Sequence, residues 1–175
     1  MKSGLNPNGH GRGAVAALAA TLLLGAVQTA DARPQEPQSI IGTWELAAAD
    51  KLLPDGTRVS DYGPNPHGLV IFTADGRYSL QIYRTNRLKF ASGEKFSGTP
   101  EEYKDASLGM SASFGHYEVD PVKHIITFHR DRSSVPNQDD TTGVDPYELN
   151  GDTLSWKVAA RKDGSIPITV LRRAR

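Results

Sequence analysis

Short β-rich segments separated by turn signals constrain the fold of this chain more than any other feature. Tight turns such as Asp75-Gly76, Asn150-Gly151 and Asp163-Gly164 lie between them, and Asx-Gly between two β-rich runs is typical of a hairpin. Eight such segments occur, at residues 41–48, 69–73, 77–84, 114–119, 123–130, 147–149, 153–159 and 166–172. We therefore predict an all-β protein with eight antiparallel strands, a number that can close a barrel around one small ligand.

One segment departs from this pattern, between the third and fourth predicted strands. Thr99 can cap a helix, Pro100 suits the first helical position, and Glu102 completes a capping box. Tyr103 and Met110 then share one apolar face with Ala106, at spacings of three and four. The pattern predicts a short helix from Pro100 that covers one barrel opening.

The first predicted strand contains Gly42 and Trp44, whose side-chain positions face the same way on a pleated strand. A glycine beside the indole lets another segment approach closely. The last strand ends in Arg172 and Arg173, and we expect one of the two to lie against the indole face. We assign structural roles to Gly42, Trp44 and Arg172.

Seven short motifs of the chain form a set. They are I-G-T-W-E-L (41–46), L-P-D-G (53–56), Y-G-P-N-P-H-G (62–68), I-F-T-A-D-G-R-Y-S (71–79), G-T-P-E-E-Y (98–103), F-G-H-Y-E-V-D (114–120) and G-D-T-L-S-W (151–156). Together they resemble the bacterial lipocalin-like domain family, a branch of the calycin β-barrels, and the likeness weakens over residues 138–147. The resemblance implies an eight-stranded barrel with an internal pocket, and it implies no particular activity.

The first 32 residues have the features of an export signal. Lys2 and Arg12 give a basic start, residues 13–30 are uncharged, and Ala30-Asp31-Ala32 supplies small residues for cleavage. We predict a signal peptide at 1–32, a disordered segment at 33–39 and the barrel domain at 40–175. An uncleaved anchor is the alternative, because the uncharged run is near the minimum spanning length. Cleavage would leave an exported protein, periplasmic or secreted, with no membrane span.

Composition excludes several classes of function. Lys plus Arg equals Asp plus Glu at 20 each, so no basic surplus exists to attract nucleic acid. The chain has no cysteine, which rules out disulfides, thiolate metal sites and a cysteine nucleophile. Glycines stand singly at turns rather than in a phosphate-binding loop, and the histidines lack metal-ligand spacing. We predict no cofactor and no metal.

Five residues are our candidates for a ligand-binding site inside the barrel. Alternation along the strands places Tyr78, Leu80, Tyr117, His129 and Trp156 on faces that we expect to point inward. A plain packed interior is the alternative for the aromatic side chains. The segment 123–130 is apolar on both faces, so the direction of His129 is open on pattern alone.

Three hypotheses follow for function. The first is a non-catalytic protein that binds a small hydrophobic molecule in the barrel cavity. The second is an isomerase, cyclase or hydratase that uses the same cavity, with His129 or a tyrosine as the acid–base group. The third is a purely structural or partner-binding barrel with a filled interior. No G-x-S-x-G motif is present, and we assign no catalytic residue.

Overall fold

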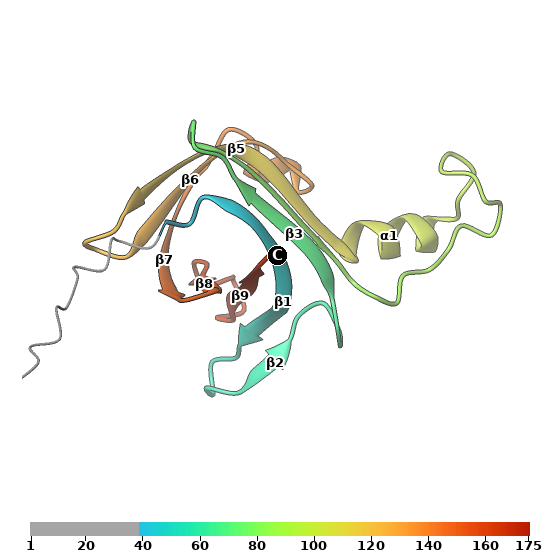
Figure 1. The fold of residues 1–175 in the computed structure, drawn as a ribbon. Helices are drawn as coiled ribbons and strands as arrows, with labels where there is room; N and C mark the ends of the chain where they lie inside the picture. Colours follow the sequence, from blue (N-terminus) through green and yellow to red (C-terminus); the bar gives the residue numbers. More distant parts are fainter. Residues whose placement is uncertain (1–38) are drawn as a thin grey trace, which may run out of the picture. The chain divides into compact units, whose positions relative to one another are not determined.

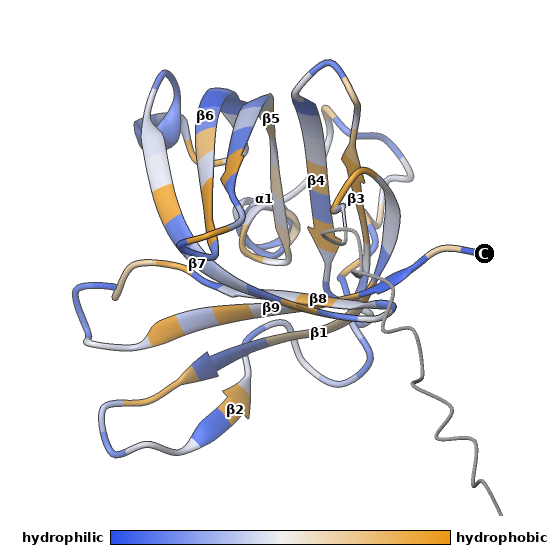
Figure 2. Ribbon diagram, turned by 60° about the vertical axis from the view of Figure 1, so that its left-hand side comes forward, coloured by the Kyte–Doolittle hydropathy of each residue, from blue (hydrophilic) through white to orange (hydrophobic). Residues whose placement is uncertain are grey.

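Alternating apolar and polar side chains build nine strands and one α-helix in this computed structural model, which describes residues 39–175 (Figures 1 and 2). The strands are β1 (Gly42–Leu52), β2 (Arg58–Ser60), β3 (His67–Phe72), β4 (Arg77–Tyr83), β5 (Met110–Asp120), β6 (Ile125–Ser133), β7 (Thr142–Asn150), β8 (Thr153–Lys157) and β9 (Ile166–Arg173). The helical segments are α1 (Pro100–Leu108) and the 3-10 turn η1 (Pro136–Gln138). The predicted signal peptide and its cleavage after Ala32 lie outside the described residues.

The sheet closes on itself because the first and last strands pair. Each strand from β3 to β8 pairs antiparallel with the next along the chain, β1 pairs with β3, and β9 pairs back with β1. These eight strands form the predicted antiparallel barrel. The remaining strand, β2, pairs with the end of β1 at Asp50–Leu52. The sequence did not predict β2, so the helix lies between the fourth and fifth strands in chain order, not between the third and fourth.

One end of the barrel is filled by side chains, and we call it the closed end. The short connections 73–76, 121–124 and 151–152 lie there. Trp44, Phe72, Ile126, Leu154 and Leu171 are fully buried and pack into one cluster. Because such a cluster removes a continuous apolar surface from water, it stabilises the closed end of the barrel.

Trp44 anchors the closed end. The indole is 0% exposed, and its Nε1 donates to the carbonyl of Ile40 at 2.7 Å. The guanidinium of Arg173 lies 4.2 Å from the ring centroid and donates to the carbonyls of Ile41 and Ser39. A cation over a tryptophan face contributes about 0.5–2 kcal/mol.

The arginine over Trp44 is therefore Arg173, so the structural role that we assigned to Arg172 belongs to the next residue. Trp44 pairs with Arg173 across β1 and β9, whereas Arg172 pairs with Glu45, so alternation turns Arg172 to the outer face. Gly42 has a φ of 128°, and a Cβ there would lie 3.2 Å from Nη1 of Arg173. The glycine thus leaves room for the guanidinium.

The opposite end, which we call the open end, carries the long connections 53–66, 84–109, 134–141 and 158–165. Helix α1 belongs to the second of them, and it begins with the predicted capping box, in which Thr99 and Glu102 cap each other. None of its residues is buried, and Tyr103 packs on Phe90 of the same connection, with ring centroids 5.4 Å apart. Figure 1 shows α1 beside the strands rather than over the barrel.

Candidate binding cavity in the barrel

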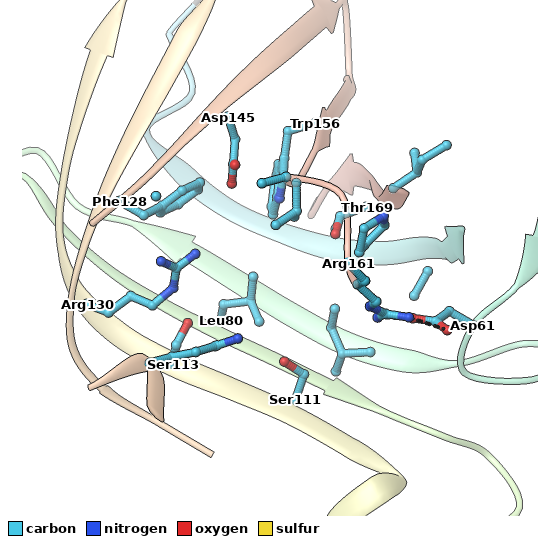
Figure 3. A pocket seen from close by; sticks show the side chains of 18 of the residues that line it. Asp61, Leu80, Ser111, Ser113, Phe128, Arg130, Asp145, Trp156, Arg161 and Thr169 are labelled. Carbon is cyan, nitrogen blue, oxygen red and sulfur yellow. Dashed lines mark hydrogen bonds and ion pairs between the residues drawn. The ribbon is translucent and has the colours of Figure 1, made fainter. Parts of the chain in front are cut away.

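The open end leads into a cavity of about 480 Å³ (Figure 3). Side chains from β1 and from β4 to β9 reach it, and no residue of α1 does. The prediction that the helix covers an opening is therefore wrong: no residue of α1 lines the cavity, and Tyr103 packs on Phe90 of its own connection. The cavity also shows that the interior is not filled along its whole length, contrary to the third hypothesis. Its volume lies within the range of roughly 300–1,000 Å³ typical of small-molecule sites.

Aromatic rings form the deep wall of the cavity. Phe128 packs edge to face on Tyr78 at 4.9 Å and lies 5.6 Å from the ring of Trp156. Leu80 continues this wall along β4. Burial raises the pKa of the Tyr78 phenol, which lies 3.4 Å from the hydroxyl of Ser113, so Tyr78 stays neutral at physiological pH. The wall offers an apolar surface with few polar atoms.

Arg130 brings a positive charge into the cavity. It shares a face of β6 with Phe128, and in Figure 3 its guanidinium points into the cavity. The neighbouring strand has Gly143 at this level, and a Cβ there would lie 2.7 Å from Nη2 of Arg130. A side chain at 143 would therefore displace the guanidinium. Among residues 39–175, no carboxylate forms an ion pair with Arg130.

Asp145 brings a carboxyl group into the same cavity. The residue is 3% exposed and has no hydrogen-bond or ion-pair partner among the described side chains. Burial raises the pKa of its carboxyl to about 6, although the positive charge of Arg130 opposes the shift. Asp145 therefore changes its protonation close to neutral pH.

An ion pair between two further charged groups lies at the mouth of the cavity. Arg161 donates two hydrogen bonds to Asp61, at 3.0 and 2.5 Å, and Lys51 approaches the same carboxylate at 3.2 Å. Burial alone would raise the pKa of Asp61, but Arg161 and Lys51 hold it below its ordinary value. This ion pair joins the connection after β2 to the one between β8 and β9.

The structure brings together three of the five predicted ligand-binding residues. Tyr78, Leu80 and Trp156 line the cavity. Tyr117 does not: it packs on Phe72 at the closed end, and its hydroxyl donates to the carbonyl of Thr73 at 2.9 Å. Alternation gave the correct side of the strand for Tyr117 but the wrong level along the barrel.

His129 lies on the outer surface, contrary to the prediction. Its side chain is 43% exposed, with Nδ1 3.2 Å from the hydroxyl of Thr142 and Nε2 3.4 Å from Glu118. Ile126 and Phe128 occupy the inner face of β6, at 0% and 3% exposed. Because the apolar side chains take the inner face of the strand, His129, which follows Phe128, faces outward.

Sequence reasoning missed Arg130 and Asp145, the two charged groups beside the aromatic wall of the cavity, although both carried a signal. Arg130 follows Phe128 by two positions and therefore shares its face. Asp145 precedes the buried Tyr147 by two positions, but the predicted strand began only at 147. Asp145 also lies in the segment 138–147, where the resemblance to known motifs is weakest.

Two further properties of the described residues bear on function. No cluster of three or more His, Asp or Glu side chains within residues 39–175 could hold a metal ion. In the same part of the chain, every helix is too short or too polar to cross a membrane.

Comparison with known proteins gives one family match. Residues 41–174 match the family described as the lipocalin-like domain. A lipocalin-like protein from Bacteroides uniformis is 14% identical with a TM-score of 0.38, covering 77% of this chain and 97% of the other. An uncharacterized protein from Bacteroides eggerthii is 16% identical with a TM-score of 0.38, covering 78% and 100%. No curated protein matches the sequence.

Proposed function

We propose that this chain, which belongs to the lipocalin-like domain family, binds a small and mainly hydrophobic molecule in the cavity at the open end of its barrel. One observation carries the proposal: a cavity of about 480 Å³ is walled by Tyr78, Phe128 and Trp156 and has polar groups on its other side. An apolar wall that gives affinity, with a few placed polar groups that give orientation, is the usual composition of a small-molecule site.

The direct test uses N-phenyl-1-naphthylamine, a neutral aromatic probe whose fluorescence rises in an apolar site. We expect saturable one-to-one binding to the full folded chain. Leu80→Trp should abolish binding, because the larger ring would fill the cavity beside Trp156. Gln81→Trp is the matched control, since Gln81 is exposed on the same strand and should leave binding unchanged.

The proposal is wrong if Leu80→Trp and Gln81→Trp bind the probe equally well. Equal binding by both, with unchanged far-UV circular dichroism, would mean that the probe binds outside the barrel. Native mass spectrometry of protein isolated from its own host then identifies the natural ligand as an added mass that Leu80→Trp lacks.

The proposal includes export of the protein to the periplasm or the exterior. It rests on the sequence of residues 1–32, with a charged start, an uncharged run and small residues before the expected cleavage after Ala32. N-terminal sequencing of protein from the host should begin at Arg33. A chain that still starts at Met1 in the membrane fraction would contradict this part of the proposal.

A catalytic use of the cavity is the second candidate function. Asp145, and not the outward-facing His129, is the residue that can serve as its acid–base group. A carboxyl with a pKa of about 6 can take and return a proton near neutral pH, which an isomerase, cyclase or hydratase requires. Once native mass spectrometry identifies a ligand, conversion of that ligand by the wild type and not by Asp145→Asn would establish catalysis. Unchanged ligand mass and structure after incubation would leave binding as the function.

A further inference from the structure

Two groups of opposite charge line the same cavity without pairing with each other. Arg130 and Asp145 both point into it in Figure 3, and among residues 39–175 neither takes part in an ion pair. Charged groups withdrawn from bulk water normally have a partner. Asp145 is buried and Arg130 is half-buried, and their polar groups open to the same cavity, so both are placed to meet a group of the ligand.

Arg130 is the cation of the cavity that is available to a ligand. The other lining arginine, Arg161, already has both its Nη atoms bound to Asp61 at the mouth. Arg130 has no such partner, and Gly143 leaves open the space that its guanidinium occupies. A guanidinium in this state is suited to an anion such as a carboxylate, which it can bind through two parallel N–H groups.

Asp145 decides whether that positive charge is compensated. The groups that face it are Arg130 from β6 and Tyr78 from β4, and the phenol stays neutral because burial raises its pKa. Trp156 and Thr169, from β8 and β9, line the same cavity and carry no charge. A neutral Asp145 thus leaves the cavity with the uncompensated charge of Arg130, while an ionised Asp145 cancels it.

We propose that Arg130 and Asp145 form a subsite for an acidic group carried by the ligand, with the anion on the Arg130 guanidinium and a proton on the Asp145 carboxyl. The protonated carboxyl can donate a hydrogen bond to the anion, whereas the ionised carboxylate would repel it. The natural ligand is then an amphipathic acid, with its apolar body on the aromatic wall. This inference rests on the proposed binding function.

Binding of such an acid should weaken as the pH rises. Because the carboxyl of Asp145 has a pKa of about 6, it is mostly protonated at pH 5 and mostly ionised at pH 8. The protonated fraction falls from roughly nine tenths to roughly one hundredth over this interval, so affinity for an anion that binds only the protonated form falls by up to ~90-fold. We expect a loss of at least about tenfold.

Two probes with the same ring system separate this inference from the proposed function. 1-Anilinonaphthalene-8-sulfonate carries a sulfonate that stays ionised from pH 5 to pH 8, and N-phenyl-1-naphthylamine lacks it. The anionic probe should lose affinity as the pH rises, while the neutral probe should bind equally at both values. If the neutral probe fails to bind at all, the proposed function is wrong; if it binds but the anionic probe shows no pH dependence, the acidic subsite is wrong.

Variants assign the effect to the two residues. Arg130→Gln should weaken the anionic probe at pH 5 by at least about tenfold and leave the neutral probe unchanged. Arg130→Lys should restore part of the affinity, which keeps the test valid if the glutamine variant folds poorly. Asp145→Asn should abolish the pH dependence and keep tight binding at pH 8. Arg132→Gln is the control, because Arg132 lies on the outside of β6 with Asp139 and Asp140.

The outcomes that overturn the inference are specific. Equal loss of both probes in Arg130→Gln, with Arg130→Lys no better, would assign Arg130 to structure rather than to the anion. A pH dependence that persists in Asp145→Asn would exclude Asp145 as the titrating group. The same loss of the anionic probe in Arg132→Gln would place that probe on the outer surface.

Discussion

Replacing Asp145 by asparagine should stabilise the protein at neutral pH and not at acidic pH, in the absence of any ligand. The folded-state pKa of the carboxyl is about 6 and the ordinary value is 3.8, so the unfolded chain releases the proton first as pH rises. Below pH 3.8 both states are protonated and Asp145 costs nothing. The cost of an ionised buried carboxylate then develops between pH 4 and 6 and stays constant above that range.

The magnitude follows from the difference of about 2.2 pH units between the two pKa values. At 1.36 kcal/mol per unit the upper limit is roughly 3 kcal/mol. The Asp145 carboxyl borders a cavity rather than a packed core, which allows some solvation, so we expect about 1–3 kcal/mol. Asparagine keeps the shape of the side chain and removes its charge, and therefore removes this cost.

Urea unfolding of the wild type and Asp145→Asn at pH 4 and pH 7.5 measures the effect. The difference in unfolding free energy between the two proteins should be about 1–3 kcal/mol larger at pH 7.5, because all other titrating groups cancel in the comparison. Asp120→Asn is the control: hydrogen bonds from the backbone of Lys123 lower the pKa of the exposed Asp120 carboxyl, so this variant should show no gain at pH 7.5. A difference for Asp145→Asn that is constant with pH, or larger at pH 4, would refute a buried carboxyl with a raised pKa.

Three further predictions concern the rest of the barrel. Trp44→Ala should lower the free energy of unfolding in urea by about 3–5 kcal/mol, because it leaves a cavity at the closed end and removes the ring on which Arg173 lies. A loss under 1 kcal/mol would contradict this. His129→Phe should leave binding of N-phenyl-1-naphthylamine unchanged, since the ring lies outside the barrel, and a changed affinity would place it inside. Amide hydrogens of α1 should exchange faster than those of the strands, with or without that probe, because no residue of the helix is buried or lines the cavity; protection by the probe would show that the helix closes over it.

Local features of the sequence predicted most of the fold. The Asp75-Gly76 turn joins β3 to β4, and Gly76 has the left-handed φ of 79° that the tight turn needs. The capping box of Thr99 and Glu102 likewise starts α1 at Pro100. These signals depend only on neighbouring residues, so a single sequence contains them in full.

The site was harder to predict because it depends on contacts between strands. Alternation tells which residues share a face, but not which face points inward when both are apolar, as on β6. It also gives no level along the barrel, which is why Tyr117 lies at the closed end although its side was correct. The pairing of β5 with β6 has a register shift between Phe114 and Gly115. Beyond Arg130, the residues of β6 therefore change the side of the sheet that they face.

The pairing of β1 with β9 has a consequence for how the chain folds. Trp44 on the first strand is opposite Arg173 on the last, so the ring of strands cannot close until nearly the whole described chain is available. Contacts between such distant segments make folding slow, and until they form β1 and β9 each present an unpaired edge. A chain shortened before Ile166 should therefore join edge to edge with other copies and aggregate rather than form a smaller barrel.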